Sequence, residues 1–144
     1  MLSALDYIQP GMKGLDYGCG PGPALAELLA RRNIECDNYD PFFYPNKKTD
    51  RYDFILSTEV FEHLYNPSQD IENIASRIKP GGFLGIMTVR WTDLEQFKNW
   101  YYLNDDTHVI FFHRKSFEYI CDTYSFDIIH DDGIRVIILK KNPC

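Results

Sequence analysis

Three glycines at alternating positions, Gly18, Gly20 and Gly22, have the spacing that most clearly predicts chemistry in this chain. They follow a short apolar segment at 15–17 that can form a buried strand, and they precede strong helix formers at 24–32. A strand that turns through glycines into a helix points free backbone N–H groups at a ligand above the turn. Glycine is needed because the backbone bends sharply and the ligand approaches it closely. The pattern therefore predicts a ligand-binding loop.

Two common nucleotide-binding loops do not fit this spacing. The pattern G-x-G-x-x-G, counted from Gly18, reaches Gly20 and then Pro23, so its third glycine is absent. A P-loop requires Lys followed by Ser or Thr, and neither is present. Asp40 lies 20 residues after Gly20, at the end of the next expected strand, where a carboxylate can bind a ribose diol. Asp40 is explained equally well as a turn residue before Pro41.

A second group of chemically capable residues follows the apolar segment at 52–57. Glu59, Glu62 and His63 form the sequence E-x-x-E-H. Together with His108 they offer two carboxylates and two imidazoles, which suit a divalent cation. Alternatively, His63 or His108 acts as a general base near neutral pH. A purely structural explanation is that His63 packs at a helix terminus and Glu62 is solvated.

An alternation of strand and helix patterns predicts the framework that positions these residues. We expect a mostly parallel α/β sheet with helices on both faces, in which the glycine loop lies at the ligand-binding carboxyl edge. A hard stop and turn is expected at 79–82, where the chain reads Lys-Pro-Gly-Gly. The expected strands are 15–18, 36–40, 52–57 and 83–89, the helices 3–9, 23–32, 67–78, 93–101 and 115–124, and the antiparallel hairpin 126–130 with 134–140.

Length, net charge and cysteine spacing limit the classes of protein to which this chain can belong. A length of 144 residues predicts a single domain over 1–144. The net charge of −6 argues against nucleic-acid or anionic-membrane partners. No apolar run approaches the length of a membrane span, and the chain does not begin like a secretory signal. Four cysteines without CxxC or metal spacing indicate reduced thiols, so a cytoplasmic protein is expected.

Several motifs in a fixed order resemble class I S-adenosylmethionine-dependent methyltransferases. Within that class the chain looks closest to the small-molecule branch that includes ubiquinone-type O-methyltransferases. The resemblance covers residues 14 to about 140, with Asp40 at the position of the ribose-binding acid. The matching segments are Leu15-Asp16-Tyr17-Gly18-Cys19-Gly20-Pro21-Gly22, the strand and E-x-x-E-H region 52–64, Ile78-Lys79-Pro80-Gly81-Gly82-Phe83-Leu84, Asp106-Thr107-His108-Val109 and Tyr124-Ser125-Phe126.

The resemblance implies a Rossmann-like doubly wound fold, an S-adenosylmethionine cofactor, and methyl transfer to an oxygen or nitrogen of a small molecule. Asp16 would reach the ammonium group of the cofactor and Asp40 its ribose hydroxyls. The backbone at Gly18, Cys19 and Gly20 would pack against the methionine part. Many relatives carry the EHL sequence without a metal, so we predict His63 and His108 as catalytic residues and no bound metal. The remaining cofactor contacts would come from Pro41, Phe42, Ser57, Thr58 and Glu59.

One interval departs from the family pattern. Only 11 residues separate Asp40 from Tyr52, where relatives fit a helix and a third strand. We therefore predict that this unit is shortened or missing and that the sheet has about six strands, with the second at the edge. Phe42, Phe43 and Tyr44 would then stack on the adenine, or instead cover the exposed edge.

The segment before the motif region, which begins at residue 14, is also short, at 13 residues. Relatives commonly close over the cofactor and substrate with extra helices at this end. We therefore expect that the chain could form a homodimer that completes the site. The alternative function is a catalytically weak or inactive methyltransferase fold that acts by protein association.

Overall fold

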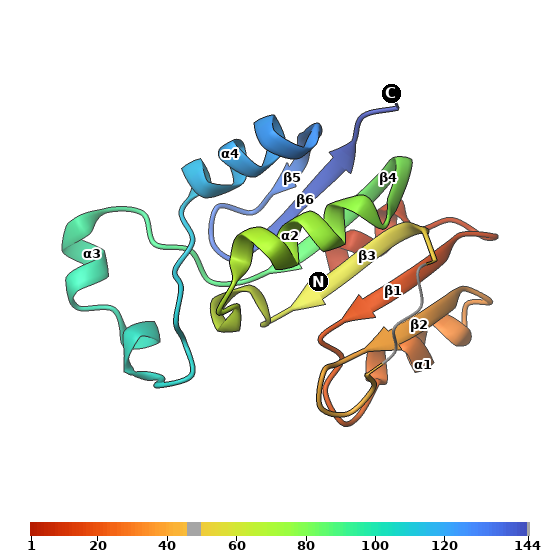
Figure 1. The fold of residues 1–144 in the computed structure, drawn as a ribbon, viewed down its shortest axis with the longest axis horizontal. Coiled ribbons are helices and arrows are strands. Elements are labelled where there is room, and N and C mark those ends of the chain that lie inside the picture. The colour runs from red at the N-terminus through yellow and green to blue at the C-terminus, as the bar shows by residue number, and fades with distance from the viewer. Residues whose placement is uncertain (46–49, 144) are drawn as a thin grey trace.

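A single six-stranded sheet organises the computed structural model, which describes residues 1–45 and 50–143. The strand order is β2-β1-β3-β4-β6-β5 (Figure 1). Neighbouring strands from β2 to β4 are parallel, whereas β6 pairs antiparallel with both β4 and β5. The strands are β1 Lys13–Tyr17, β2 Glu35–Tyr39, β3 Tyr52–Thr58, β4 Ile78–Met87, β5 Phe126–Asp131 and β6 Val136–Lys141.

Helices cover both faces of this sheet, as the doubly wound prediction requires. Figure 1 shows α2 and α4 in front of the sheet and α1 behind it. Two apolar cores result, one beneath α2 and α4 and the other beneath η1 and α1. The helices are α1 Ala24–Ala30, α2 Pro67–Ser76, α3 Leu94–Lys98 and α4 Arg114–Tyr124, with short 3₁₀ turns η1 Leu2–Tyr7, η2 Phe61–His63 and η3 Tyr101–Asn104.

The apolar faces of α2 and α4 explain why both helices pack on the same side. Ile71 and Ile74 of α2 are buried, as are Phe117 and Ile120 of α4. Each pair is spaced by three residues, so its side chains lie on one face of the helix. Phe117 is completely buried and packs in a cluster with the rings of two further phenylalanines, Phe61 and Phe112.

Strand β2 lies at the edge of the sheet and β3 follows it in the chain, so the predicted loss of the third-strand unit is confirmed. Within the connection, Asp40 and Tyr44 form an isolated antiparallel bridge. Residues 46–49 of the expected irregular segment lie outside the described residues. In the described part of the chain, no helix has the length and apolar character needed to cross a membrane.

Two expected elements differ in the structure. The predicted turn at 79–82 is wrong, because β4 runs through it from Ile78. Tyr52 pairs with Ile78 and Phe54 with Phe83, so the extra residues form a bulge, with Gly81 at φ +78°. The helix expected at 93–101 is shorter, since α3 covers only Leu94–Lys98.

Candidate active site

The glycine loop between β1 and α1 is tied to the end of β2. The backbone N–H groups of Gly18 and Cys19 both donate to the carbonyl of Tyr39, at 2.7 and 3.0 Å. Gly18 has φ +83° and Gly20 has φ +66°, a region that L-residues with side chains rarely adopt. A Cβ on Gly18 would also lie 2.3 Å from a methyl carbon of Val60. Both the backbone angle and the close packing therefore require glycine at position 18.

Asp40 is held beside this loop by three backbone donors. Its Oδ2 accepts from Gly20 N at 3.1 Å, and its Oδ1 accepts from Phe42 N and Phe43 N at 2.9 and 3.2 Å. These bonds give Asp40 the turn role considered from the sequence. Each carboxylate oxygen can accept two hydrogen bonds, so the same group retains capacity for ligand hydroxyls. Pro41, Phe42 and Phe43 follow Asp40 and are exposed.

Asp16 is a buried carboxylate near the end of β1. Its side chain is 6% exposed, and in the described part of the chain no hydrogen-bond donor reaches it. Burial raises the pKa of Asp16 to about 6. A buried acid without a protein partner suits a cationic ligand group, such as an ammonium.

The end of β3 brings the predicted residues Ser57, Thr58 and Glu59 to the same edge. Ser57 is completely buried, so its side chain is enclosed by the protein. Thr58 is half-buried, and Glu59 turns the chain at φ +54° while its N–H donates to Met87 O at 2.7 Å. This turn directs the chain away from the sheet and into η2, which carries Glu62 and His63.

The carboxyl groups of Glu59 and Glu62 are neighbours, and each affects the pKa of the other. Glu62 is completely buried and accepts a hydrogen bond from Thr88 Oγ1 at 2.8 Å. Tyr102 donates its hydroxyl to Glu59 Oε2 at 3.0 Å. Burial and the neighbouring Glu62 raise the pKa of Glu59. Burial opposes ionisation of Glu62 as well, but hydrogen bonds from Glu59 and Thr88 prevail and lower its pKa. Glu62 is therefore the stronger acid of the pair.

His63 and His108 are oriented toward this pair. His63 Nδ1 lies 2.8 Å from Thr107 O, and His108 Nδ1 lies 2.7 Å from Tyr102 O. A carbonyl only accepts, so each Nδ1 carries a proton and each neutral ring keeps Nε2 as an acceptor. The Nε2 atom of His63 lies 3.8 Å from Glu62 Oε1. The two rings are 5.0 Å apart between centroids.

This cluster has two chemical capabilities. The ligand atoms of Glu62, His63 and His108 all lie within 4.8 Å of one another. Both histidines donate Nδ1–H to a backbone carbonyl, as metal-bound histidines usually do, so the donor set fits a divalent cation. Without a cation, the same Nε2 atoms can accept protons.

The sequence interpretation did not foresee the contacts that three supporting residues make with this cluster. Thr88 and Tyr102 hydrogen-bond the two carboxyl groups, and Asp105 Oδ2 lies 3.4 Å from His108 Nε2. Thr88 directly follows β4, so its place at the carboxyl edge is a signal that could have found it. Tyr102 and Asp105 lie in a loop of irregular structure and 3₁₀ turn, where spacing along the chain does not reveal which residues meet.

The carboxyl edge thus gathers a glycine loop, two buried acids and an acid–histidine cluster. A family model described as a methyltransferase domain matches residues 1–131. The chain belongs to this family. It is a class I S-adenosylmethionine-dependent methyltransferase domain, which implies S-adenosylmethionine as the cofactor.

Known relatives of this methyltransferase domain agree with the assignment. The chain is 27% identical over 117 residues to the ubiquinone biosynthesis O-methyltransferase of Shewanella halifaxensis, covering 61% of this chain and 49% of that protein. The mitochondrial enzyme of the same description from Rattus norvegicus is 31% identical over 113 residues, covering 58% of this chain and 32% of that protein. The chain thus spans at most about half the length of these curated relatives.

A solved structure shares the fold. A crystal structure of a SAM-dependent methyltransferase from Archaeoglobus fulgidus superposes with a TM-score of 0.70 at 20% sequence identity. The match covers 97% of this chain and 90% of that one. It therefore supports the methyltransferase fold, including its mostly parallel sheet and C-terminal antiparallel hairpin.

Proposed function

We propose that the chain transfers a methyl group from S-adenosylmethionine to an oxygen or nitrogen of a small molecule held against the acid–histidine cluster. The observation that carries this proposal is the convergence of His63, His108 and Glu62 at the carboxyl edge of β3. That edge is shared with the glycine loop, because β1 and β3 are neighbouring parallel strands. A ligand over the loop therefore lies next to groups that can take a proton.

Cofactor binding follows from the residues around the loop. The unpartnered Asp16 carboxylate would bind the ammonium group, and Asp40 would bind the ribose hydroxyls with its remaining lone pairs. The exposed ring of Phe42 would stack on the adenine. The bound cofactor supplies an electrophilic methyl group on its sulfonium, so the protein contributes orientation and proton removal.

Proton removal would use the Nε2 atoms of His63 and His108. Their Nδ1–H bonds to carbonyls hold both rings in the tautomer that accepts at Nε2. Ionised Glu62 beside His63 stabilises the imidazolium that forms. A divalent cation fits the same donors, and when bound it would lower the pKa of a coordinated acceptor hydroxyl.

Calorimetry with S-adenosylhomocysteine tests the cofactor part. Asp40→Ala should weaken binding at least tenfold, since it removes the ribose acceptor and the bond to Gly20 N. Asp122→Ala, at an exposed position on α4, serves as the matched control. No binding to the unaltered protein at millimolar ligand would refute the proposal.

Methyl transfer from radiolabelled S-adenosylmethionine to a library of phenols and amines tests the chemical part. His63→Ala and His108→Ala should lose turnover while keeping affinity for S-adenosylhomocysteine. Repeating the assay after chelation, with and without added Mg²⁺ or Zn²⁺, separates a cation site from a general base. Cofactor binding without transfer to any acceptor would instead favour a non-catalytic protein that acts by association.

A further inference from the structure

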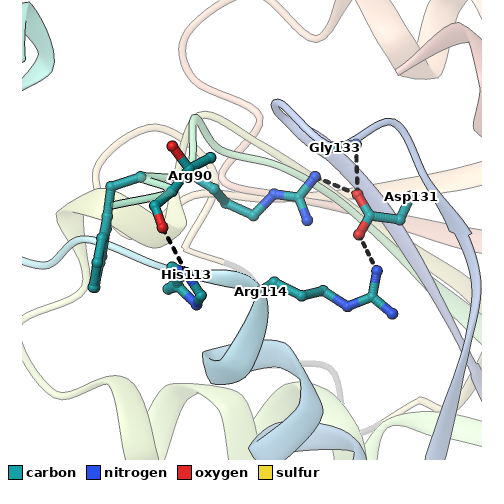
Figure 2. Close-up of a pocket in the computed structure, with 7 residues that line it drawn as sticks. Arg90, His113, Arg114, Asp131 and Gly133 are labelled. Atoms are coloured by element: carbon teal, nitrogen blue, oxygen red, sulfur yellow. Dashed lines mark hydrogen bonds and ion pairs between the residues drawn. The ribbon is translucent and has the colours of Figure 1, made fainter. Parts of the chain in front are cut away.

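A separate cavity of about 210 Å³ opens farther along the carboxyl edge of the sheet. It lies between the segment after β4, the start of α4 and the β5–β6 turn (Figure 2). None of the groups assigned above to the cofactor or to proton transfer lines it. The lining residues are Arg90, Trp91, Thr92, His113, Arg114, Asp131 and Gly133.

Two arginines in this cavity share one carboxylate. Figure 2 shows the Arg90 and Arg114 side chains both directed at Asp131, which each contacts through an Nη atom. Arg90 is only 4% exposed, and Gly133 N also donates to Asp131 Oδ1 at 2.7 Å. These donors prevail over burial and lower the pKa of Asp131 far below its usual range. Two guanidinium groups against one carboxylate give the lining a formal charge of +1.

Two further acids, which do not line the cavity, also pair with these arginines and oppose this charge. Asp132 lies 3.4 Å from Arg90 Nη2, but it accepts backbone N–H bonds from residues 134–136 and does not line the cavity. Glu118 lies 3.4 Å from Arg114 Nε on the solvent side, where its side chain is 55% exposed. The N-terminus of α4, which begins at Arg114, adds positive partial charge.

The rest of the lining is flat and uncharged. The Trp91 and His113 rings lie 4.5 Å apart between centroids. His113 Nδ1 accepts from Lys115 N at 3.1 Å, and Nε2 lies 3.1 Å from Thr92 O, to which it donates. An anion entering the cavity therefore meets two guanidinium groups beside an aromatic surface.

The cavity continues the proposed acceptor site. Thr88, which holds Glu62, and Arg90 are both buried and flank half-buried Val89 in the segment that follows β4. Their N–H groups donate to Arg135 O and Ile134 O, so this segment runs beside the hairpin. Two residues of extended chain span about 7 Å. One small molecule can therefore reach from the acid–histidine cluster to the arginines.

We propose that this cavity binds a carboxylate group of the methyl acceptor, so that the substrate is a small unsaturated or aromatic acid. This inference rests on the proposed methyl transfer. Arg90 and Arg114 would pair with the carboxylate, and Trp91 would pack on the adjoining carbon atoms. The acceptor oxygen or nitrogen would then lie toward His63 and His108.

The test uses benzoate and its neutral isostere benzamide as probes. Each is titrated into ¹⁵N-labelled protein, and binding is read from the Trp91 indole N–H and the backbone amides of residues 90–92 and 113–114. We expect benzoate to bind at least tenfold more tightly than benzamide, and to weaken with added salt. Arg114→Gln should remove most of this preference, whereas Arg31→Gln, at an exposed site after α1, should leave it unchanged.

Equal affinities for the two probes in the unaltered protein would overturn the proposal without any variant. An unchanged preference in Arg114→Gln, with folding verified by circular dichroism, would also overturn it. Calorimetry with S-adenosylhomocysteine separates the two claims. Cofactor binding without probe discrimination contradicts the carboxylate subsite alone. Discrimination without cofactor binding contradicts the acceptor role and the proposed function together.

Discussion

Asp16→Asn offers a sharp test of the cofactor site, because the charge of Asp16 is unfavourable until a ligand pairs with it. Burial raises the pKa of this carboxyl from 3.8 to about 6. A shift of this size corresponds to about 3 kcal/mol between the two protonation states. Well below pH 3.8, near pH 3, the group is protonated in both folded and unfolded chains, so it contributes nothing. The free energy of unfolding then falls as the pH rises from 3.8 to 6. Above pH 6 the full loss, about 3 kcal/mol, remains.

Asn carries no charge at either pH, so the variant should be more stable than the unaltered protein at pH 7, by up to about 3 kcal/mol. Near pH 3, below both pKa values, the two should be equal. Urea unfolding followed by circular dichroism at both pH values measures this difference. Asp127→Asn, at an exposed position of β5, is the matched control and should change little. An Asp16→Asn variant that is less stable at pH 7 would refute the reasoning.

The same titration should govern cofactor affinity. If the ammonium group pairs only with ionised Asp16, the apparent affinity for S-adenosylhomocysteine scales with the ionised fraction. With a pKa of about 6, binding at pH 5 should be about tenfold weaker than at pH 8. Asp16→Asn should bind weakly with no dependence on pH in this range. A flat pH profile in the unaltered protein would contradict the assigned role.

Three further experiments test the geometry described above. Gly18→Ala should destabilise the fold by about 3 kcal/mol in urea unfolding, because it combines a positive φ with a clash against Val60. Gly20→Ala, with no neighbour within 4 Å of the added carbon, should lose only about 1 kcal/mol, and equal losses would contradict this account. His113→Ala should lower stability by about 1 kcal/mol by removing the α4 cap, and His113→Asn should recover most of it; if Asn behaves like Ala, the cap is not the cause. Burial raises the pKa of Cys19 to about 11, so about one thiolate in a thousand exists at pH 8, and peptide mapping should find it slow to react with iodoacetamide.

Much of the fold follows from local patterns in the sequence. The apolar spacing of Ile71 and Ile74 predicts the buried face of α2, and the short interval after Asp40 predicts that β2 lies at the edge. These features depend on nearby residues alone. The bulge in β4 could not be predicted, because Pro80 and Gly81 are equally compatible with a turn and only pairing with β3 decides between them.

Part of the candidate site could also be predicted from the sequence, because some of its residues are close together in the chain. Glu62 and His63 are neighbours in the chain, and their motif marks them. Their partners Thr88, Thr107 and Tyr102 come from other segments. The tautomers of the histidines depend on backbone carbonyls, which every residue has, so no sequence pattern reports them.

The position of β6 has a consequence for synthesis on the ribosome. This strand comes last among the six but lies inside the sheet, with Ile137, Ile138 and Leu139 completely buried. Its partner β4 ends at Met87. One edge of β4 therefore stays unpaired until β6 has been synthesised as far as Lys141. At translation rates of about 5–20 residues per second, the delay is roughly 3 to 11 s. During this time the nascent chain exposes an apolar strand edge, which chaperones can bind before the sheet is complete.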